Sequence, residues 1–173
     1  MSVLRLMHLS RYQTEQLRIA SALIDRMLFL PLFLVEKQFN IDDANHGLLI
    51  GWLIMIAMLH MLYAAWLHHR YGYTFGKWLV GIRVFDLSES RNLTWKEGIR
   101  REALYFIIEL TVIFAFYFNI AGQQGQGFFF EKYHNLTRNV SLVWIFVTLS
   151  VMLSNPKRRS IPDFFGKSVV VKC

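Results

Sequence analysis

The segment at residues 48–67, LLIGWLIMIAMLHMLYAAWL, contains no Asp, Glu, Lys or Arg. An apolar run of about 20 residues is long enough, as a helix, to cross the ~30 Å hydrocarbon core of a bilayer. The composition agrees, because 54% of the 173 residues are hydrophobic and 18% are charged, whereas a soluble domain usually has about 45–50% apolar and about 25% charged residues. We therefore expect a membrane protein.

Three further apolar segments accompany this one, and together they predict a single domain over residues 1–173 with four membrane-spanning helices. The predicted spans lie approximately at residues 17–35, 48–67, 103–121 and 140–153. In the first, Pro31 predicts a kink. The fourth is short, so its length also suits a re-entrant or buried helix. The expected fold is an all-α, four-helix transmembrane bundle.

Basic residues in the connections predict the orientation. The N-terminal segment, the second connection and the C-terminal tail are rich in Lys and Arg, whereas the first connection is acidic and the third has few charges. Because cytoplasmic loops carry the excess of Lys and Arg, both termini are expected in the cytoplasm. The first apolar run is followed by VEKQFN rather than a cleavage site, so we expect it to remain as a span.

Several functional classes are disfavoured by the composition. One cysteine, Cys173, excludes an internal disulfide and argues against a cysteine-based zinc site. The net charge of +7 is the ordinary orientation signal beside spans, so we expect no nucleic-acid partner. No nucleophile–base pair and no set of metal ligands stands out, so we expect neither an enzyme nor a bound cofactor or metal.

Charged residues lie inside the first predicted span. Arg18 and Asp25 are seven residues apart, which places them on nearly one helix face but about 10.5 Å apart along the axis. Each therefore needs a partner on another element. Asp25 is either a paired packing residue or a proton- or cation-binding carboxylate in a water-filled cavity. Arg26 either snorkels to the interface or pairs with Glu109.

Two more titratable residues occupy other spans. Glu109 lies in the third and His60 in the second. With Asp25 they place one titratable group on each of three spans, an arrangement that suits proton coupling if the three converge. The sequence does not determine that convergence. A lone histidine in a span is more often a hydrogen-bonded packing residue than a proton relay, which favours packing for His60.

The segment YTFGKWLVGIRVF at residues 73–85 has apolar residues at helical spacing. We expect an interfacial amphipathic helix on the cytoplasmic side, since aromatic and basic residues favour that depth. A cytoplasmic gate or a lipid-headgroup site is the alternative. The motif residues of this segment are Phe75, Gly76, Lys77, Gly81 and Arg83.

The chain also contains a weak internal repeat. RIASALID at residues 18–25 resembles REALYFIIE at residues 101–109, and FGKWLVG at residues 75–81 resembles FGKSVVV at residues 165–171. This predicts two halves of two spans each, related by a pseudo-axis along the membrane normal.

Taken together, RIASALID, TFGKWLVGIRVFD and IPDFFGKSVVV resemble the RDD family of small bacterial membrane proteins, over residues 18–171. The resemblance matches the family's arginine to Arg18 and its two aspartates to Asp25 and Asp163. Ser168 stands where that family's closing pattern has threonine. Arg18 is then either a cytoplasmic flank alone or a clamp to Asp163.

The resemblance implies a multi-pass protein of the bacterial cytoplasmic (inner) membrane that transports ions or small solutes, including cation–proton exchange. The alternative is a non-transporting scaffold or accessory subunit. A carrier needs intramembrane carboxylates that are accessible to water. In a scaffold these carboxylates are expected to be paired with other protein groups and shielded from water. The expected partners are the lipid bilayer, a monovalent cation or proton, and further copies of the chain, because four short spans enclose little space.

Overall fold

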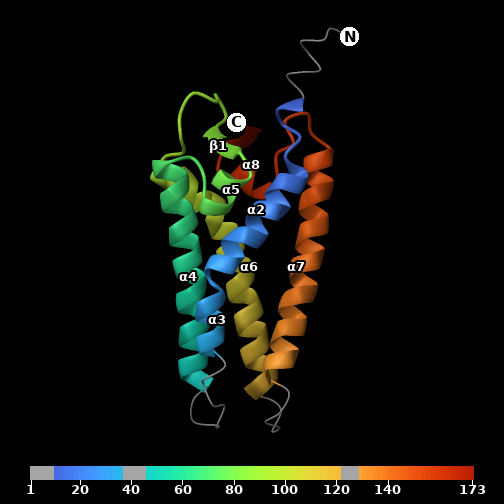
Figure 1. Cartoon of the computed structure of the whole chain (residues 1–173). Coiled ribbons are helices and arrows are strands. Elements are labelled where there is room, and N and C mark those ends of the chain that lie inside the picture. The colour runs from blue at the N-terminus through green and yellow to red at the C-terminus, as the bar shows by residue number, and fades with distance from the viewer. Residues whose placement is uncertain (1–9, 37–45, 122–128) are drawn as a thin grey trace.

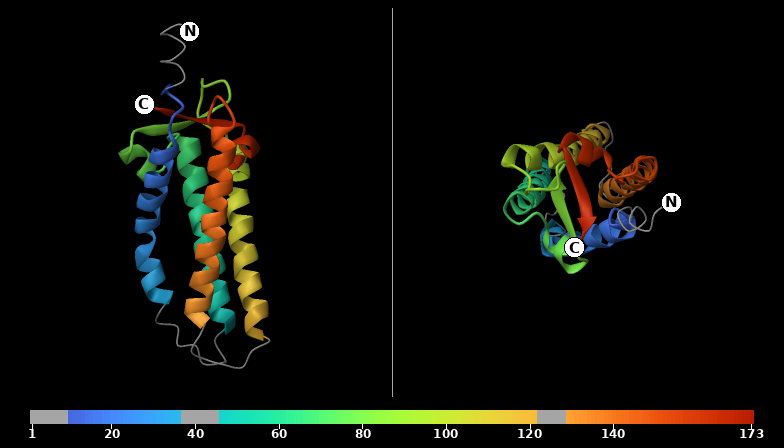
Figure 2. Two further views of the ribbon diagram at one scale, coloured as in Figure 1. Left: turned by 90° about the vertical axis from the view of Figure 1, so that its right-hand side faces the viewer. Right: turned by 90° about the horizontal axis from the view of Figure 1, so that it is seen from above.

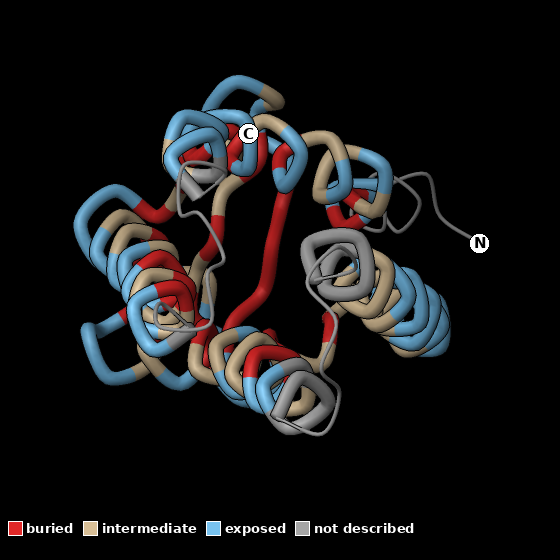
Figure 3. Tube along the Cα trace, turned by 90° about the horizontal axis from the view of Figure 1, so that it is seen from below, coloured by how far each residue is buried: buried red, intermediate tan, exposed pale blue. Residues whose placement is uncertain are grey.

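The computed structural model describes residues 10–36, 46–121 and 129–173. Four long helical segments stand side by side around a common centre (Figure 1, Figure 2). They are α2 (Glu15–Leu28) with its continuation α3 (Leu30–Glu36), α4 (His46–Arg70), α6 (Trp95–Ala121) and α7 (Phe129–Leu153). Buried residues face the interior of this bundle and exposed residues face outward (Figure 3).

The outer surface of the bundle is apolar. Among the described residues, α4 and α7 contain stretches long and apolar enough to cross a membrane. On α7 the side chains of Leu142, Val143 and Phe146 are 59%, 64% and 72% exposed. Exposed apolar surface of this extent is stable against lipid and unfavourable in water, so these helices are suited to a bilayer.

The first predicted span is broken. Helix α2 ends at Leu28 and α3 begins at Leu30, with the Phe29 N–H donating to the Arg26 carbonyl at 3.1 Å. Pro31 has no N–H, and its ring clashes with the carbonyl four residues earlier, which ends the helix just before it. The predicted kink is confirmed. The fourth segment is longer than predicted, because α7 already begins at Phe129.

A small cap covers the end of the bundle where the chain terminates (Figure 2). It contains two short helices, α5 (Phe75–Leu79) and α8 (Ile161–Phe165), and two strands, β1 (Ile82–Asp86) and β2 (Ser168–Lys172). The strands pair antiparallel, with Val84 opposite Val170. Their apolar side chains form a core of their own with Leu93.

The cap corrects two predictions. The fold is not all-α, and residues 75–85 do not form one amphipathic helix. Gly81 has a positive φ of 70°, a conformation that ends the helix and favours glycine. After it the sequence IRVFD is buried at alternate positions, the period of a strand. The apolar residues of this segment fit both the helical period and the strand period. Pairing with the distant segment SVVVK determines that IRVFD forms a strand.

The order of elements recurs along the chain. Two long helical segments, a short helix and a strand occur first as α2/α3–α4–α5–β1 and then as α6–α7–α8–β2. Gly81 and Lys167, each directly before a strand, both have positive φ, at 70° and 49°. The strand register is symmetric about the Val84–Val170 pair. These features fit a two-fold pseudo-axis along the bundle.

The repeat differs from the predicted one in one alignment. Phe75-Gly76-Lys77 opens α5, whereas Phe165-Gly166-Lys167 lies at the end of α8 and after it. The two FGK triplets are therefore not structurally equivalent. The equivalent residues are those that precede the short helices, Thr74 and Ser160, which are the N-caps of α5 and α8.

Candidate functional site

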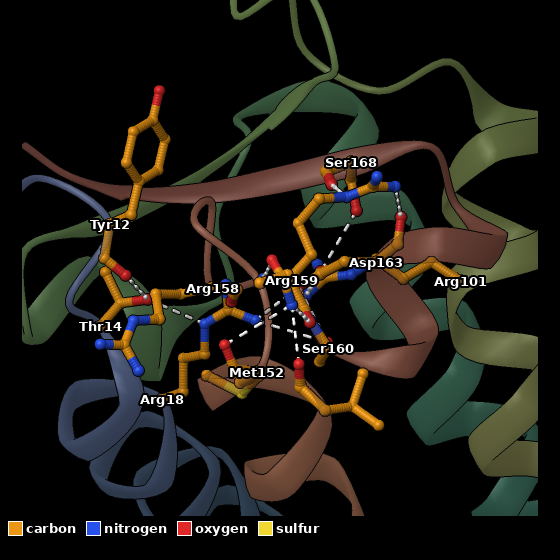
Figure 4. Close-up of polar contacts among 12 residues, drawn as sticks. Tyr12, Thr14, Arg18, Arg101, Met152, Arg158, Arg159, Ser160, Asp163 and Ser168 are labelled. Atoms are coloured by element: carbon orange, nitrogen blue, oxygen red, sulfur yellow. Dashed lines mark hydrogen bonds and ion pairs between the residues drawn. The ribbon is translucent and has the colours of Figure 1, made fainter. Parts of the chain in front are cut away.

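The carboxylate of Asp163 is the centre of a buried ionic cluster in the cap (Figure 4). Asp163 is the third residue of α8, and its Oδ2 accepts from the Ser160 backbone N–H at 2.9 Å and from the Ser160 hydroxyl at 2.8 Å. A carboxylate at this helix position often reaches back to the N-cap. The side chain is fully buried, so its charge needs cationic partners.

Two arginines supply those partners from different helices. Arg18 Nη1 of α2 lies 2.5 Å from Asp163 Oδ2, and Arg101 Nη2 of α6 lies 3.1 Å from Asp163 Oδ1. These are the two arginines of the predicted repeat. Burial raises the pKa of Asp163, but Arg18 and Arg101 lower it more and hold it well below its usual range. The cluster fastens α2, α6 and α8 together and forms the ion pair that the clamp interpretation of Arg18 requires.

Asp25 occupies a second buried cluster on α2, about two turns beyond Arg18. Its carboxylate accepts from the Tyr63 hydroxyl at 3.0 Å, the Gly76 N–H at 2.8 Å and the Thr74 hydroxyl at 2.5 Å. Tyr63 belongs to α4, and the other two donors belong to the start of α5. Asp25 is thus fully partnered and joins three elements, as the packing interpretation requires.

Gly76 allows this close approach. A Cβ atom at this position would lie 2.1 Å from the Ser21 carbonyl oxygen and 3.0 Å from Asp25 Cγ. Any larger residue would push α5 away from α2. The FGK motif therefore contributes a contact point between a cap helix and the first long helix.

The other motif residues lie in or beside the cap. Lys77 Nζ is 3.4 Å from the Thr74 hydroxyl, and burial, with the nearby Arg101 charge, lowers the pKa of Lys77 to about 8. Arg83 donates to Asn92 Oδ1 at 3.0 Å. Phe75 and Trp78 are exposed, in the way that aromatic residues line a membrane interface.

A cavity of about 300 Å³ lies between α2, α6 and α7. Its lining includes acidic, basic and histidine side chains: Glu15, Arg18, Arg26, His60, Lys77, Arg101 and Glu109. Asp25 is not part of this lining. Of the three titratable residues whose convergence the sequence left open, the structure brings His60 and Glu109 to one cavity and places Asp25 outside its lining.

Glu109 differs from the two aspartates. Within the described parts of the chain it forms no hydrogen bond and no ion pair, and the alternative pairing with Arg26 is not formed although both residues line the cavity. His60 packs edge-on against the Phe29 ring, with centroids 5.2 Å apart. Glu109 is thus an unpaired carboxylate at the cavity, as far as the described residues go.

The sequence from residue 16 to residue 167 matches the RDD family. The chain belongs to that family. Neither a curated protein nor a solved structure shows significant similarity to it. Family membership, together with the outward-facing apolar surfaces of α4 and α7, identifies this RDD protein as a membrane protein.

Several partners of the signature residues in this RDD protein were missed from the sequence. Ser160 and Thr74 precede the short helices, and Ser160 with Asp163 forms a capping pattern that sequence alone can reveal. Tyr63 carried no such signal, because its role depends on how α4 packs against α2.

A buried triad beside the cap was also missed. His68 Nδ1 lies 3.2 Å from Glu102 Oε1, and Arg101 Nη1 lies 3.2 Å from His68 Nε2. These residues come from facing turns of α4 and α6. The three side chains connect α4 to α6 through contacts among an imidazole, a carboxylate and a guanidinium.

Proposed function

We propose that this RDD protein crosses the bacterial cytoplasmic membrane four times, with both termini in the cytoplasm, and transports ions or small solutes through the cavity between α2, α6 and α7. Support for the topology comes from four long helical segments that stand in parallel and from basic residues in and around the cap. The cap then lies at the cytoplasmic surface.

The unpaired state of Glu109 carries the proposal. Glu109 lies eight residues beyond Arg101 on α6, about 12 Å further from the cap. A charged residue at such depth costs roughly 2.5–3.5 kcal/mol. Asp25 offsets a cost of this kind with three hydrogen-bond donors, whereas Glu109 has none and faces a cavity. An unpaired carboxylate that faces a cavity is suited to binding a proton or a cation that enters the cavity.

Exchange follows from competition at one carboxylate. If Glu109 binds either a proton or a monovalent cation, but not both, each can move only after the other has left. His60 and Arg26 line the same cavity and set the local charge. Arg18, Asp163 and Arg101 hold the surrounding helices at the cap end, so they form the framework rather than the binding group.

Ion flux in proteoliposomes tests the proposal. A monovalent cation gradient should drive proton movement through the native protein, and Glu109→Gln should abolish it while eluting as a monodisperse species. The matched control is Glu97→Gln, which alters a carboxylate paired with Arg91 at the start of α6 and should leave flux unchanged. Equal flux in native protein and Glu109→Gln would remove Glu109 from the pathway.

A non-transporting scaffold or accessory subunit is the second candidate. The observation that favours it is the complete pairing of Asp25 and Asp163, the residues that match the RDD signature. Absence of flux in the folded native protein, tested with several monovalent cations, would favour this function. Association of further copies of the chain, which either function permits, is measured by native mass spectrometry in detergent.

A further inference from the structure

The inner face of α7 carries a polar stripe. Thr137, Ser141, Trp144 and Thr148 recur at spacings of four, three and four residues, so they lie along one helix face. All four line the cavity between α2, α6 and α7. The opposite face of the same helix carries Val143 and Phe146, which are 64% and 72% exposed.

Three members of this polar stripe hold a buried polar atom without a hydrogen-bond partner: Thr137 Oγ1, Trp144 Nε1 and Thr148 Oγ1. Other Ser and Thr hydroxyls of the described long helices, outside the stripe, donate to carbonyls of their own helix. Thr111 donates to the Ile107 carbonyl at 2.8 Å, and Ser150 donates to the Phe146 carbonyl at 2.9 Å. Buried polar groups left unpaired are unfavourable, so the stripe requires partners that the described protein residues do not supply.

Helix packing does not seal the stripe. Helix α4 of the first half packs closely along α6 of the second half, and Gly98 approaches the Ala65 carbonyl so nearly that a Cβ would lie 3.0 Å from it. By the order of elements, the corresponding pair across the two halves is α7 with α2. Between these two helices lies the cavity instead. Both Thr137 and Thr148 line this space, and rotation about χ1 moves a threonine hydroxyl between staggered positions.

We propose that the cavity is hydrated and that the polar stripe of α7, with Glu109 opposite, is the wall along which water and hydrated ions enter the bundle. The stripe extends from Thr137 to Thr148, about 16 Å along the helix. Water supplies the missing partners of the three polar atoms, as it does for buried polar groups in other proteins. The inference deepens the proposed function by locating its aqueous route, and hydration itself does not depend on transport.

The Arg18–Asp163–Arg101 cluster closes the cap end of this route. Arg18, Arg101 and Ser160 belong to the cluster and also line the cavity. Their ion pairs fill the space between α2, α6 and α8. Water in the cavity therefore meets a charged barrier at the cap in this conformation.

Labelling of single cysteines in nanodiscs with a membrane-impermeant thiol reagent tests whether water reaches the polar stripe of α7. Cys173 is exposed and is first changed to Ser, which leaves a background without cysteine. Cysteine is then placed in the stripe by Ser141→Cys or Thr148→Cys, and on the lipid-facing side of the same helix by Val143→Cys or Phe146→Cys. Because only the thiolate reacts and apolar surroundings suppress it, the stripe positions should react about tenfold faster or more.

Equal rates on the two faces of α7, or stripe cysteines that react only after unfolding, would overturn the inference. Labelling and ion flux together distinguish a failure of this inference from a failure of the proposed transport function. Rapid stripe labelling without ion flux retains the hydrated wall and rejects transport, whereas flux without stripe labelling places the route elsewhere.

The unsubstituted protein provides a second measurement that no folding defect can obscure. Hydroxyl radicals made from water oxidise methionine where water is near. Met152 is 2% exposed and lines the cavity, whereas Met58 on α4 is 45% exposed on the outer surface. In nanodiscs Met152 should be oxidised faster than Met58 despite its burial. A protected Met152 would contradict a hydrated cavity.

Discussion

The two halves of the molecule build the same backbone unit from different side chains. In each, a hydroxyl residue caps a short helix that leads into a strand: Thr74 before α5 and Ser160 before α8. The third helical residue is Lys77 in one half and Asp163 in the other. Opposite charges thus occupy matching positions, so the repeat preserves geometry and not chemistry.

Because their charges are opposite, Asp163 and Lys77 have different partners. Asp163 draws in Arg18 and Arg101, one arginine from each half. Lys77 has no carboxylate in contact with it within the described residues, and Asp25 reaches the α5 backbone instead. The second half therefore contains the ionic cluster of the cap, while the first is held mainly by neutral donors around one carboxylate.

The largest effect is expected from breaking the ionic cluster. Asp163→Ala leaves the charges of Arg18 and Arg101 buried without their shared carboxylate, and removing one partner of such a buried pair costs about 3–5 kcal/mol. Thermal unfolding in detergent should show a large loss of stability. Glu97→Ala is the control, because it removes an equally ionic but more exposed pair with Arg91 and should change stability much less. A small effect of Asp163→Ala would show that the cluster is not what joins the halves.

An intermediate effect is expected from the contact that joins α5 to α2. Gly76→Ala places a methyl group 2.1 Å from a backbone oxygen of Ser21, so the helices must separate, at a cost of about 1–3 kcal/mol. The control is Gly51→Ala in α4, where no atom lies within 4 Å of the added Cβ and where alanine favours the helix. The two unfolding midpoints should shift in opposite directions. A neutral Gly76→Ala would mean that α5 is free to move.

The smallest effect is expected from Lys77. Burial lowers its pKa to about 8, below the unfolded value of about 10.4. Between these values the unfolded chain binds the proton and the folded chain does not, so stability rises with pH across this window. Lys77→Met should raise the unfolding temperature at pH 7 and flatten the rise between pH 8 and 10. An unchanged slope in Lys77→Met would assign the pH dependence to another group.

Local sequence signals predicted the long helices and one partnership of the charged residues. The uncharged run at residues 48–67 lies inside α4, and Pro31 predicted the break between α2 and α3. Both predictions depend on local sequence alone. The helix follows from the length of the apolar run, and the break follows from the missing N–H of proline. The resemblance to the RDD family also brought Arg18 and Asp163 together as candidates, because matched motifs carry spatial information that composition does not.

Tertiary structure alone determined the cap and the cavity. IRVFD is compatible with a helix or a strand until it meets SVVVK, which lies at the other end of the chain. The Asp25 carboxylate is hydrogen-bonded to protein groups and not exposed to water, because Tyr63 and the start of α5 both contact it. Glu109 faces a cavity because α7 stands apart from α2. Strand pairing, burial and cavities depend on contacts between distant residues, and no local pattern of apolar and charged side chains encodes those contacts.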